Sequence, residues 1–355
     1  MKKILLFSTL ALFSVLAVKI CNAPASDKTD TTGTLVVANK SGDNISLIDR
    51  ATGKTIKMLP TGLQPHEVEV SDDGKYAVVT NYGDRENPGK SLSVYDIEQA
   101  KVIRTIDLKE NTRPHGMKWL EGTNKMLVTT EGSNSLLLVN ITTGEIEKKM
   151  GTEQEISHMV AATPDARYAF VSSIRTGNVT VFNLESGALL QQLYSGEGAE
   201  GIAVSPDGKE LWVTNRGENT IAIFNINTFE LIKKLECGDF PIRAKFSPSG
   251  NLFVVSNAES GEIAVIDARA KKMLDKIKLT PPVPEDEDPE RYFSEFEGTS
   301  VPIGLVVPDD KYAYVANTRS DVVSVFDLEK MEVIAHYKAG KEPDGINYSS
   351  FVLEK

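Results

Sequence analysis

The sequence is poor in cysteine, histidine and basic side chains. It has 355 residues, of which two are cysteine and four are histidine. Two cysteines cannot build a disulfide framework, and neither has the spacing of a zinc site or of covalent haem attachment. Lys and Arg number 39 against 50 Asp and Glu, which leaves a formal net charge of −11. Nucleic acids and anionic membranes bind through Lys and Arg, so neither is expected as a partner.

Several signatures of catalysis are missing as well. The sequence contains no Gly-x-Ser-x-Gly nucleophile elbow, no His-Glu-x-x-His motif and no Walker loop. With 41% hydrophobic residues the composition is that of an ordinary globular protein, too apolar for disorder and long enough for a sizeable core.

The first residues have the pattern of a secretory signal peptide. Lys2 and Lys3 precede an apolar run from Ile4 to Val18, and a small-residue site ends at Ala25. A basic start, an apolar stretch of about 15 residues and an A-x-A-like site are typical of such a peptide, and the run is short for a transmembrane helix. We expect a signal peptide over 1–25, a polar linker over 26–33 and an exported protein without a transmembrane segment.

Cys21 supports an alternative, a lipoprotein whose acylated Cys21 is the anchor and whose residues 26–33 are the tether. Lys19 and Ile20 argue against it, because lipoprotein signals carry small residues just before the cysteine. Both alternatives describe an exported protein, located in the periplasm, at the cell surface or secreted. In both, Cys237 has no cysteine partner, so no intramolecular disulfide is expected in the mature chain.

Self-similarity dominates the remaining sequence. Seven short runs end in small or polar residues: Val36–Asn39, Val78–Asn81, Leu127–Thr130, Phe170–Ser173, Trp212–Asn215, Val254–Asn257 and Tyr314–Asn317. After a polar turn, each is followed by an alternating segment: Asn44–Asp49, Ser91–Asp96, Ser135–Asn140, Asn178–Asn183, Thr220–Asn225, Glu262–Asp267 and Val322–Asp327. Alternation with period two, together with many β-branched and aromatic residues, predicts strands.

Two further strands complete each repeat. One follows, as in Glu230–Leu235, and one precedes and ends in a turn such as Ser205–Gly208. Four short strands per about 42 residues predict the blade of a β-propeller. The first repeat lacks its leading strand, and Pro343–Tyr348 supplies that pattern at the far end. We predict an all-β, seven-bladed β-propeller over 34–355, closed by a C-terminal strand that completes the first blade.

These repeats resemble a known family. The run Trp212–Asn215, preceded by Ser205-Pro206-Asp207-Gly208-Lys209, resembles the YVTN-repeat propellers of bacterial secreted and surface proteins. The resemblance covers residues 34–349. It implies a fold and leaves the activity open, because propellers serve many unrelated functions.

The candidate site is one mouth of the central channel. The first strand of each repeat lines the channel and begins roughly Pro-x-Gly, where the x residues are His66, His115, His158, Glu200, Ile242, Ile303 and Asp344. Three of the four histidines thus occupy one repeat position in successive blades, which makes this mouth the expected site. The same rim should receive Arg216, the turn Tyr82–Lys90 and one large acidic insertion, Pro281–Gly298, with the aromatics Tyr292 and Phe293.

Three interpretations of this ring remain open. The x residues could cap turns and face a water-filled channel. They could bind a metal, because imidazoles of His66, His115 and His158 with the carboxylate of Glu200 suit Zn²⁺ or Cu²⁺. They could also bind or convert a small organic substrate, with a histidine or a carboxylate as general base.

A second resemblance bears on the substrate interpretation. Residues 199–226 are similar to one blade of the seven-bladed lactonase family, and Pro114-His115 and Glu200 match its Pro-His motif and its acidic residue. The resemblance implies Glu200, His115 and Arg216 as catalytic candidates. The family has Arg at two flanking channel positions, which here are His158 and Ile242. Arg243 is offset by one residue and is therefore expected to point elsewhere.

Binding is the function we favour from the sequence, with a protein or a small molecule as the partner. The recognition residues we expect are His66, His115, His158, Asp344, Arg243, Tyr292 and Phe293. Lactonase-like or metal-dependent catalysis is the alternative. His336 lies in an outer strand and is expected to be structural.

Overall fold

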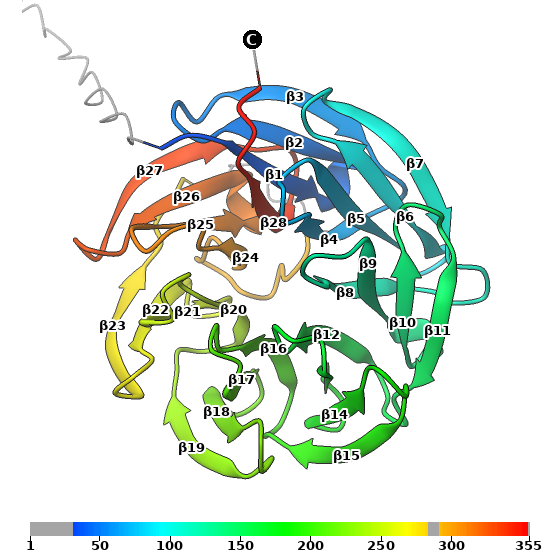
Figure 1. The fold of residues 1–355 in the computed structure, drawn as a ribbon. Coiled ribbons are helices and arrows are strands. Elements are labelled where there is room, and N and C mark those ends of the chain that lie inside the picture. The colour runs from blue at the N-terminus through cyan, green and yellow to red at the C-terminus, as the bar shows by residue number, and fades with distance from the viewer. Residues whose placement is uncertain (1–30, 283–290, 354–355) are drawn as a thin grey trace, which may run out of the picture.

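The computed structural model describes residues 31–282 and 291–353. Seven four-stranded antiparallel sheets surround a central channel as the blades of a propeller (Figure 1). The predicted all-β fold is therefore confirmed. The predicted signal peptide and Cys21 lie outside the described residues. Among the described residues, no helix has the length and apolar character needed to cross a membrane.

Each blade is a meander whose first strand lies innermost. The strands, from the channel outward, are β28 (Pro343–Ser349), β1 (Thr34–Asn39), β2 (Asn44–Asp49) and β3 (Thr55–Pro60) in blade 1; β4 (Pro65–Val70), β5 (Tyr76–Gly83), β6 (Pro88–Asp96) and β7 (Lys101–Asp107) in blade 2; β8 (Pro114–Trp119), β9 (Lys125–Thr130), β10 (Ser135–Asn140) and β11 (Ile146–Gly151) in blade 3; and β12 (Ser157–Ala162), β13 (Tyr168–Ser173), β14 (Asn178–Asn183) and β15 (Leu189–Tyr194) in blade 4.

The remaining blades follow the same order. They are β16 (Ala199–Val204), β17 (Glu210–Asn215), β18 (Thr220–Asn225) and β19 (Leu231–Glu236) in blade 5; β20 (Pro241–Phe246), β21 (Leu252–Asn257), β22 (Glu262–Asp267) and β23 (Lys272–Lys278) in blade 6; and β24 (Pro302–Val306), β25 (Tyr312–Asn317), β26 (Val322–Asp327) and β27 (Glu332–Lys338) in blade 7. Short 3₁₀ helices follow β1, β9 and β25: η1 (Lys40–Gly42), η2 (Glu131–Ser133) and η3 (Thr318–Ser320).

The C-terminal strand closes the ring, as predicted. β28 pairs antiparallel with β1, with Thr34 opposite Ser349 and Val37 opposite Ile346. In Figure 1 the two ends of the chain's colour range, blue and red, meet in this blade. The pairing removes an inner edge strand that would otherwise expose its backbone hydrogen-bonding groups.

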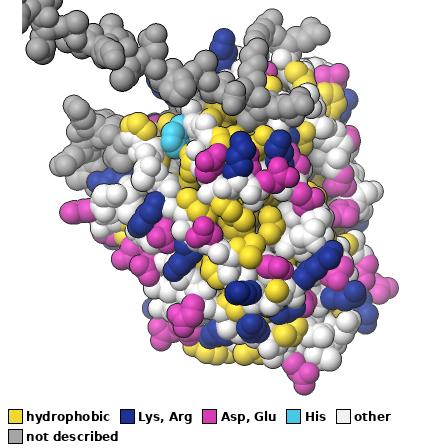
Figure 2. All heavy atoms as spheres, turned by 90° about the vertical axis from the view of Figure 1, so that its left-hand side faces the viewer, with side chains coloured by type: hydrophobic (Ala, Val, Ile, Leu, Met, Phe, Trp, Pro, Cys, Tyr) yellow, Lys and Arg dark blue, Asp and Glu magenta, His cyan; other side chains and the backbone are white. Residues whose placement is uncertain are grey.

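The core lies between neighbouring blades. Trp212 of β17 packs at 4.7 Å, between ring centroids, on Phe253 of β21, and both are fully buried. Burying a side chain such as Phe253 contributes about 1.5–3 kcal/mol. The outermost strands are much more exposed, and Leu190, Leu231 and Leu274 face solvent there. Figure 2 shows one flank of the disc, where hydrophobic side chains are surrounded by acidic and basic ones.

A β-bulge opens each inner strand and shapes the channel mouth. In β4, Pro65 is opposite Asn81, but Val68 is opposite Val79, so an extra residue is accommodated between them. Related shifts occur at the start of β8, β12, β16, β20 and β24, and between β28 and β1. A bulge interrupts the alternation of side-chain direction, so two consecutive residues can face the channel.

The recurring Thr and Asn of the second strand stabilise this geometry. The hydroxyl of Thr80 accepts the backbone N–H of Glu67 at 2.9 Å, and that of Thr214 accepts the N–H of Gly201 at 2.9 Å. These N–H groups lie at the bulges, where the ladder is interrupted. The side chain of Asn81 accepts the N–H of Gly62 at 2.9 Å and so ties the connection between blades to the rim.

Candidate functional site

The second residue of each inner strand lies at one mouth of the channel. In chain order these residues are His66, His115, His158, Glu200, Ile242, Ile303 and Asp344, and all seven are buried. The structure therefore brings the three histidines together with Glu200 and Asp344 in the ring that the repeat pattern indicates.

The three imidazoles form a stack. The ring of His115 lies 4.1 Å from that of His66 and 3.8 Å from that of His158, measured between centroids. Burial, together with the neighbouring His158 and His66, holds the pKa of His115 well below its usual range. Burial also lowers the pKa of His66, although the adjacent Asp344 opposes this effect. His66 and His115 are therefore neutral at pH 7.

His158 lies between two carboxylates. Its Nδ1 is 2.5 Å from Glu131 Oε1, and its Nε2 is 2.5 Å from Glu200 Oε1. Burial disfavours the charged ring, but Glu200 and Glu131 outweigh that effect and raise the pKa of His158. With both nitrogens donating to carboxylates, His158 is an imidazolium held in one orientation.

Glu200 connects His158 to two arginines. Its Oε1 accepts from Arg243 Nη1 at 2.8 Å, and its Oε2 is 3.0 Å from Arg216 Nη1. Burial alone would raise the pKa of Glu200, but the charges of His158, Arg216 and Arg243 lower it to about 2. Glu200 is therefore ionised throughout the physiological pH range.

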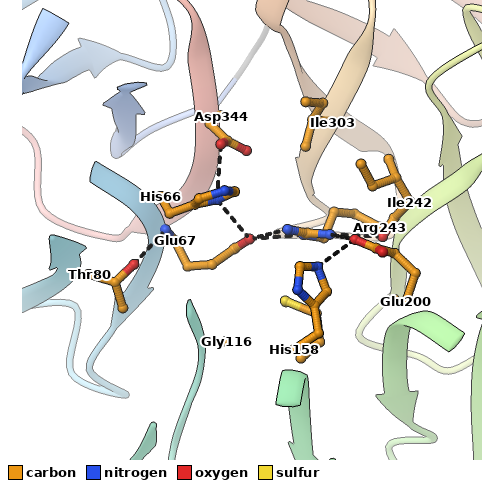
Figure 3. A network of polar contacts seen from close by, with 12 residues as sticks. His66, Glu67, Thr80, Gly116, His158, Glu200, Ile242, Arg243, Ile303 and Asp344 are labelled. Carbon is orange, nitrogen blue, oxygen red and sulfur yellow. Dashed lines mark hydrogen bonds and ion pairs between the residues drawn. The ribbon is translucent and has the colours of Figure 1, made fainter. Parts of the chain in front are cut away.

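The expectation that Arg243 points away from the channel is wrong. Its guanidinium is buried in the channel and binds Glu67 Oε1 through Nε at 2.9 Å and Nη2 at 2.6 Å, as well as Glu200 (Figure 3). The bulge at the start of β20, between Pro241 and Arg243, is the physical reason, because it breaks the strict alternation of the strand. Burial lowers the pKa of Arg243, but Glu67 and Glu200 outweigh it and raise the value.

Glu67 and Arg243 divide the channel into two cavities. Their ion pair joins blade 2 to blade 6, on opposite sides of the ring (Figure 3). A cavity of about 270 Å³ lies at the histidine mouth and includes His66, His115, His158 and Arg216 in its wall. A second cavity of about 450 Å³ opens at the opposite end, and Glu67 and Arg243 line it. The two cavities share no lining residue, and Glu67 and Arg243 line only the second.

A second ring of side chains lies at the end of the second strand of each blade or directly after it. Its members are Lys40, Tyr82, Glu131, Ile174, Arg216, Ala258 and Thr318. The repeat pattern places Arg216 and the turn that begins at Tyr82 at this rim, and it also places Lys40 and Glu131 there, although the sequence-based site did not include them. Lys40 and Glu131 could have been found from the sequence. Each directly follows one of the seven short runs, Val36–Asn39 and Leu127–Thr130, and so occupies the same repeat position as Arg216.

Lys40 lies at the edge of the histidine stack. Its Nζ is 3.2 Å from His66 Nε2, 4.0 Å from Asp344 Oδ2 and 3.6 Å from the ring centroid of Tyr292. Burial lowers the pKa of Lys40, against the opposing charge of Asp344. On the far side of His66, Nδ1 is 3.0 Å from Asp344 Oδ2. Tyr82 donates to Glu131 at 2.5 Å and forms another wall of the pocket.

The insertion is anchored to the rim by an ion pair. Arg291 binds both carboxylate oxygens of Asp321, at 3.0 and 2.9 Å. The next residue, Tyr292, reaches the pocket wall. Phe293 does not line the pocket and packs instead on Phe240, with ring centroids 5.4 Å apart, in the hydrophobic cluster beside the mouth. The acidic tract 283–290 lies outside the described residues.

The predicted metal ligands lie close together, but two of them are already engaged. His158 uses both ring nitrogens on carboxylates, and Glu200 binds two arginines. Among the described residues, the donor groups with metal-site spacing are His66 with Glu67 and His115, and His115 with Glu131 and His158. His336 lies apart in β27, with Nδ1 2.9 Å from the hydroxyl of Ser324. Cys237 is a buried free thiol.

Comparison with known proteins supports the architecture. Residues 189–287 match the model of the family described as "Lactonase, 7-bladed beta-propeller". The chain is also similar to Antigen Lp49 of Leptospira interrogans, with 24% identity over 159 residues, which are 44% of this chain and 34% of that protein. The chain therefore aligns with about a third of the length of this curated relative.

Solved propellers share the fold at low identity. Hydrazine synthase of Kuenenia stuttgartiensis superposes with a TM-score of 0.68 and 18% identity, covering 87% of this chain and 98% of that one. A protein of unknown function from Desulfotomaculum acetoxidans superposes with a TM-score of 0.73 and 14% identity, covering 90% and 99%. These likenesses show the fold alone, which is compatible with the YVTN-repeat resemblance.

Proposed function

We propose that the protein is a binding module that recognises a small organic anion in the pocket at the histidine mouth. The charge of the pocket wall carries this proposal. Its cationic members are Lys40, Arg85, Arg113, Arg216 and the imidazolium of His158, and its acidic members are Asp84 and Glu131. An excess of positive charge in a chain of net charge −11 favours an anionic ligand at this one place.

Two of these cations retain donors for a ligand. Arg216 binds Glu200 through Nη1, and its side chain is 26% exposed. A guanidinium has five N–H donors, so several remain to bind a carboxylate in bidentate fashion. The Lys40 ammonium has three donors, and one of them is directed at His66.

The size of the pocket limits the ligand. A volume of about 270 Å³ lies near the lower end of the roughly 300–1,000 Å³ of small-molecule pockets, which suits a compact organic acid and no polymer. Tyr82 and Tyr292 contribute aromatic surface, and neutral His115 can donate or accept a hydrogen bond. The Glu67–Arg243 ion pair crosses the channel and so keeps the ligand at this mouth.

Titration calorimetry with mono-, di- and hydroxycarboxylates and with inorganic phosphate tests the proposal. We expect one saturable site, and we expect Arg216→Gln to weaken it at least tenfold, because a hydrogen bond to a charged group contributes about 1.5–3 kcal/mol. Arg175→Gln is the matched control, since Arg175 is exposed on the same rim and does not line the pocket. Equal loss in both variants, or no binding at millimolar ligand, would overturn the proposal.

Lactone hydrolysis is the second candidate, favoured by the match of residues 189–287, which contain Glu200, Arg216 and Arg243. Neutral His115 would take a proton from water as the water oxygen adds to the lactone carbonyl, and Arg216 would stabilise the oxyanion. The ring C–O bond then breaks, and the proton passes to the leaving alkoxide, which gives a hydroxycarboxylate. A panel of lactones followed by pH-stat tests this. No hydrolysis above buffer rate at high protein concentration excludes it.

Export and partner binding remain proposals supported by the sequence. The basic and apolar start favours a periplasmic or surface location, and mass spectrometry of the mature N-terminus distinguishes cleavage after Ala25 from acylation at Cys21. A protein partner of the acidic insertion is a further option. It would be lost on deletion of residues 281–290, whereas small-anion binding would persist.

A further inference from the structure

Buried polar atoms without hydrogen-bond partners gather on one side of the mouth. Within the described residues, His66 Nδ1, His115 Nδ1 and both oxygens of Asp344 are buried without a well-formed hydrogen bond, although His66 Nδ1 lies 3.0 Å from Asp344 Oδ2. Their residues are 3%, 1% and 0% exposed. Buried polar groups are nearly always satisfied, and a buried carboxylate without a donor is costly. Lys40 Nζ is 4.0 Å from Asp344 Oδ2, too far for a hydrogen bond, so His115 Nδ1 and the Asp344 carboxylate keep capacity for a ligand.

The spacing of these groups suits a metal ion. The donor atoms of His66, Glu67 and His115 lie within 4.8 Å of one another. His66 Nδ1 is 3.9 Å from Glu67 Oε1 and 3.0 Å from Asp344 Oδ2. Ligands about 2.0–2.2 Å from a tetrahedral ion lie about 3.4 Å from each other, so only a small contraction is needed.

The scaffold beneath these residues is rigid. Asp344, His66 and His115 come from blades 1, 2 and 3, whose inner strands are neighbours in the ring. A Cβ at Gly345 would lie 2.3 Å from the carbonyl oxygen of His66, which shows how closely β28 and β4 approach. The donors are therefore held by packed strands, as a preformed metal site requires.

We propose that His66, Glu67 and His115 bind one divalent transition-metal ion, with the carboxylate of Asp344 beside His66 neutralising its charge. Two imidazoles and carboxylate oxygens are typical of Zn²⁺ and Co²⁺ ligation. This set differs from the sequence-based one. His158 has both ring nitrogens on carboxylates, and Glu200 contacts arginine through both of its oxygens. Glu67 contacts Arg243 through Oε1 alone, which leaves Oε2 for the ion. The proposal does not depend on anion binding or on lactone hydrolysis.

Lys40 competes with the metal at this site. Its ammonium directs a proton at His66 Nε2, which keeps the ring proton of neutral His66 on Nδ1, the atom that faces the carboxylates. Removing the ammonium frees that proton to move to Nε2 and removes a positive charge 4.0 Å from Asp344. Lys40→Met should therefore tighten metal binding.

Cobalt titration of the full chain, purified without a polyhistidine tag and dialysed against chelator, tests the proposal. We expect visible d–d absorption that saturates at one equivalent of Co²⁺ and disappears when Zn²⁺ is added. His115→Ala and Glu67→Gln should lose at least tenfold in affinity, and Lys40→Met should gain. His336→Ala is the matched control, because His336 lies in the outer strand β27, away from the mouth. Saturation that is unchanged in His115→Ala, or absent from the native chain, overturns the proposal.

A measurement on the native chain covers the case in which His115→Ala does not fold. Electron paramagnetic resonance of bound Cu²⁺ shows hyperfine coupling from imidazole nitrogens in the first coordination sphere. Coupling from two nitrogens supports the site, and coupling from none or from one overturns it. Neither the cobalt titration nor the copper measurement contains an organic anion. A negative result for the metal site therefore leaves the proposed anion binding untouched, and the reverse also holds.

Discussion

Replacing the carboxylate of Glu200 by an amide, as Glu200→Gln, tests the electrostatic account of the channel. The carboxylate contacts three cationic groups, on His158, Arg243 and Arg216. These charges lower its pKa from the ordinary 4.5 to about 2. A shift of that size corresponds to about 3 kcal/mol of preference for the ionised form. Breaking a buried ion pair by removing one partner typically costs about 3–5 kcal/mol, which agrees.

The sign of the pH dependence follows from the direction of this shift. Because the folded-state pKa lies below the unfolded value, ionised Glu200 contributes its full stability above pH 4.5 and loses it as the pH falls through 2. Urea unfolding at pH 7 should show Glu200→Gln less stable by about 3 kcal/mol, or melting about 5–10 °C lower. The difference should shrink steadily between pH 5 and pH 3.

The control is Glu197→Gln, three residues earlier and exposed, which should change stability by less than about 0.5 kcal/mol. A cost for Glu200→Gln below about 1 kcal/mol at pH 7, or a cost that does not depend on pH, would refute the reasoning. The variant should also lower the pKa of His158, because the larger of its two carboxylate interactions is lost. An NMR titration of the imidazole measures that shift.

Three further predictions follow from local packing. Gly345→Ala should cost about 1–3 kcal/mol in urea unfolding, because its Cβ would lie 2.3 Å from the His66 carbonyl; an unchanged midpoint contradicts the close approach of the strands. Arg291→Ala should loosen the segment that Asp321 holds, so that chymotrypsin cuts after Tyr292 faster than in the native protein, and equal rates contradict the anchor. Burial raises the pKa of Cys237 to about 12, so the thiol should react with DTNB only as fast as the protein unfolds; rapid labelling of the native protein contradicts this.

Much of the architecture was predictable, because it rests on short-range patterns repeated seven times. Strands such as Ser135–Asn140 and Thr220–Asn225 have the predicted bounds, since alternation with period two specifies which face is buried. The closing strand was predictable for a related reason: the first repeat lacked one strand, and the far end of the chain carried a spare one. Periodicity also placed His66, His115 and His158 at one mouth.

Other residues of the site could not be assigned from strict alternation. Strict alternation put Arg243 one residue away from the channel position, and it gave no reason to assign Glu67 to the channel. The β-bulges that turn both side chains into the channel break the period of two, so alternation cannot reveal them. Glu131 and Lys40 could have been found from their repeat position. Their roles could not, since each role depends on a partner from another blade, such as His158 for Glu131.

The sequence by itself determined the number of blades, the strand order and the mouth at which titratable side chains gather, because these follow from local hydrophobic periodicity and from repetition. Only the tertiary structure decided which of those side chains are charged, which are paired and which are left without a partner. Protonation depends on burial and on distances between residues far apart in the chain, as between Glu67 and Arg243, separated by 176 positions and 2.6 Å apart. Those distances are set by closure of the ring.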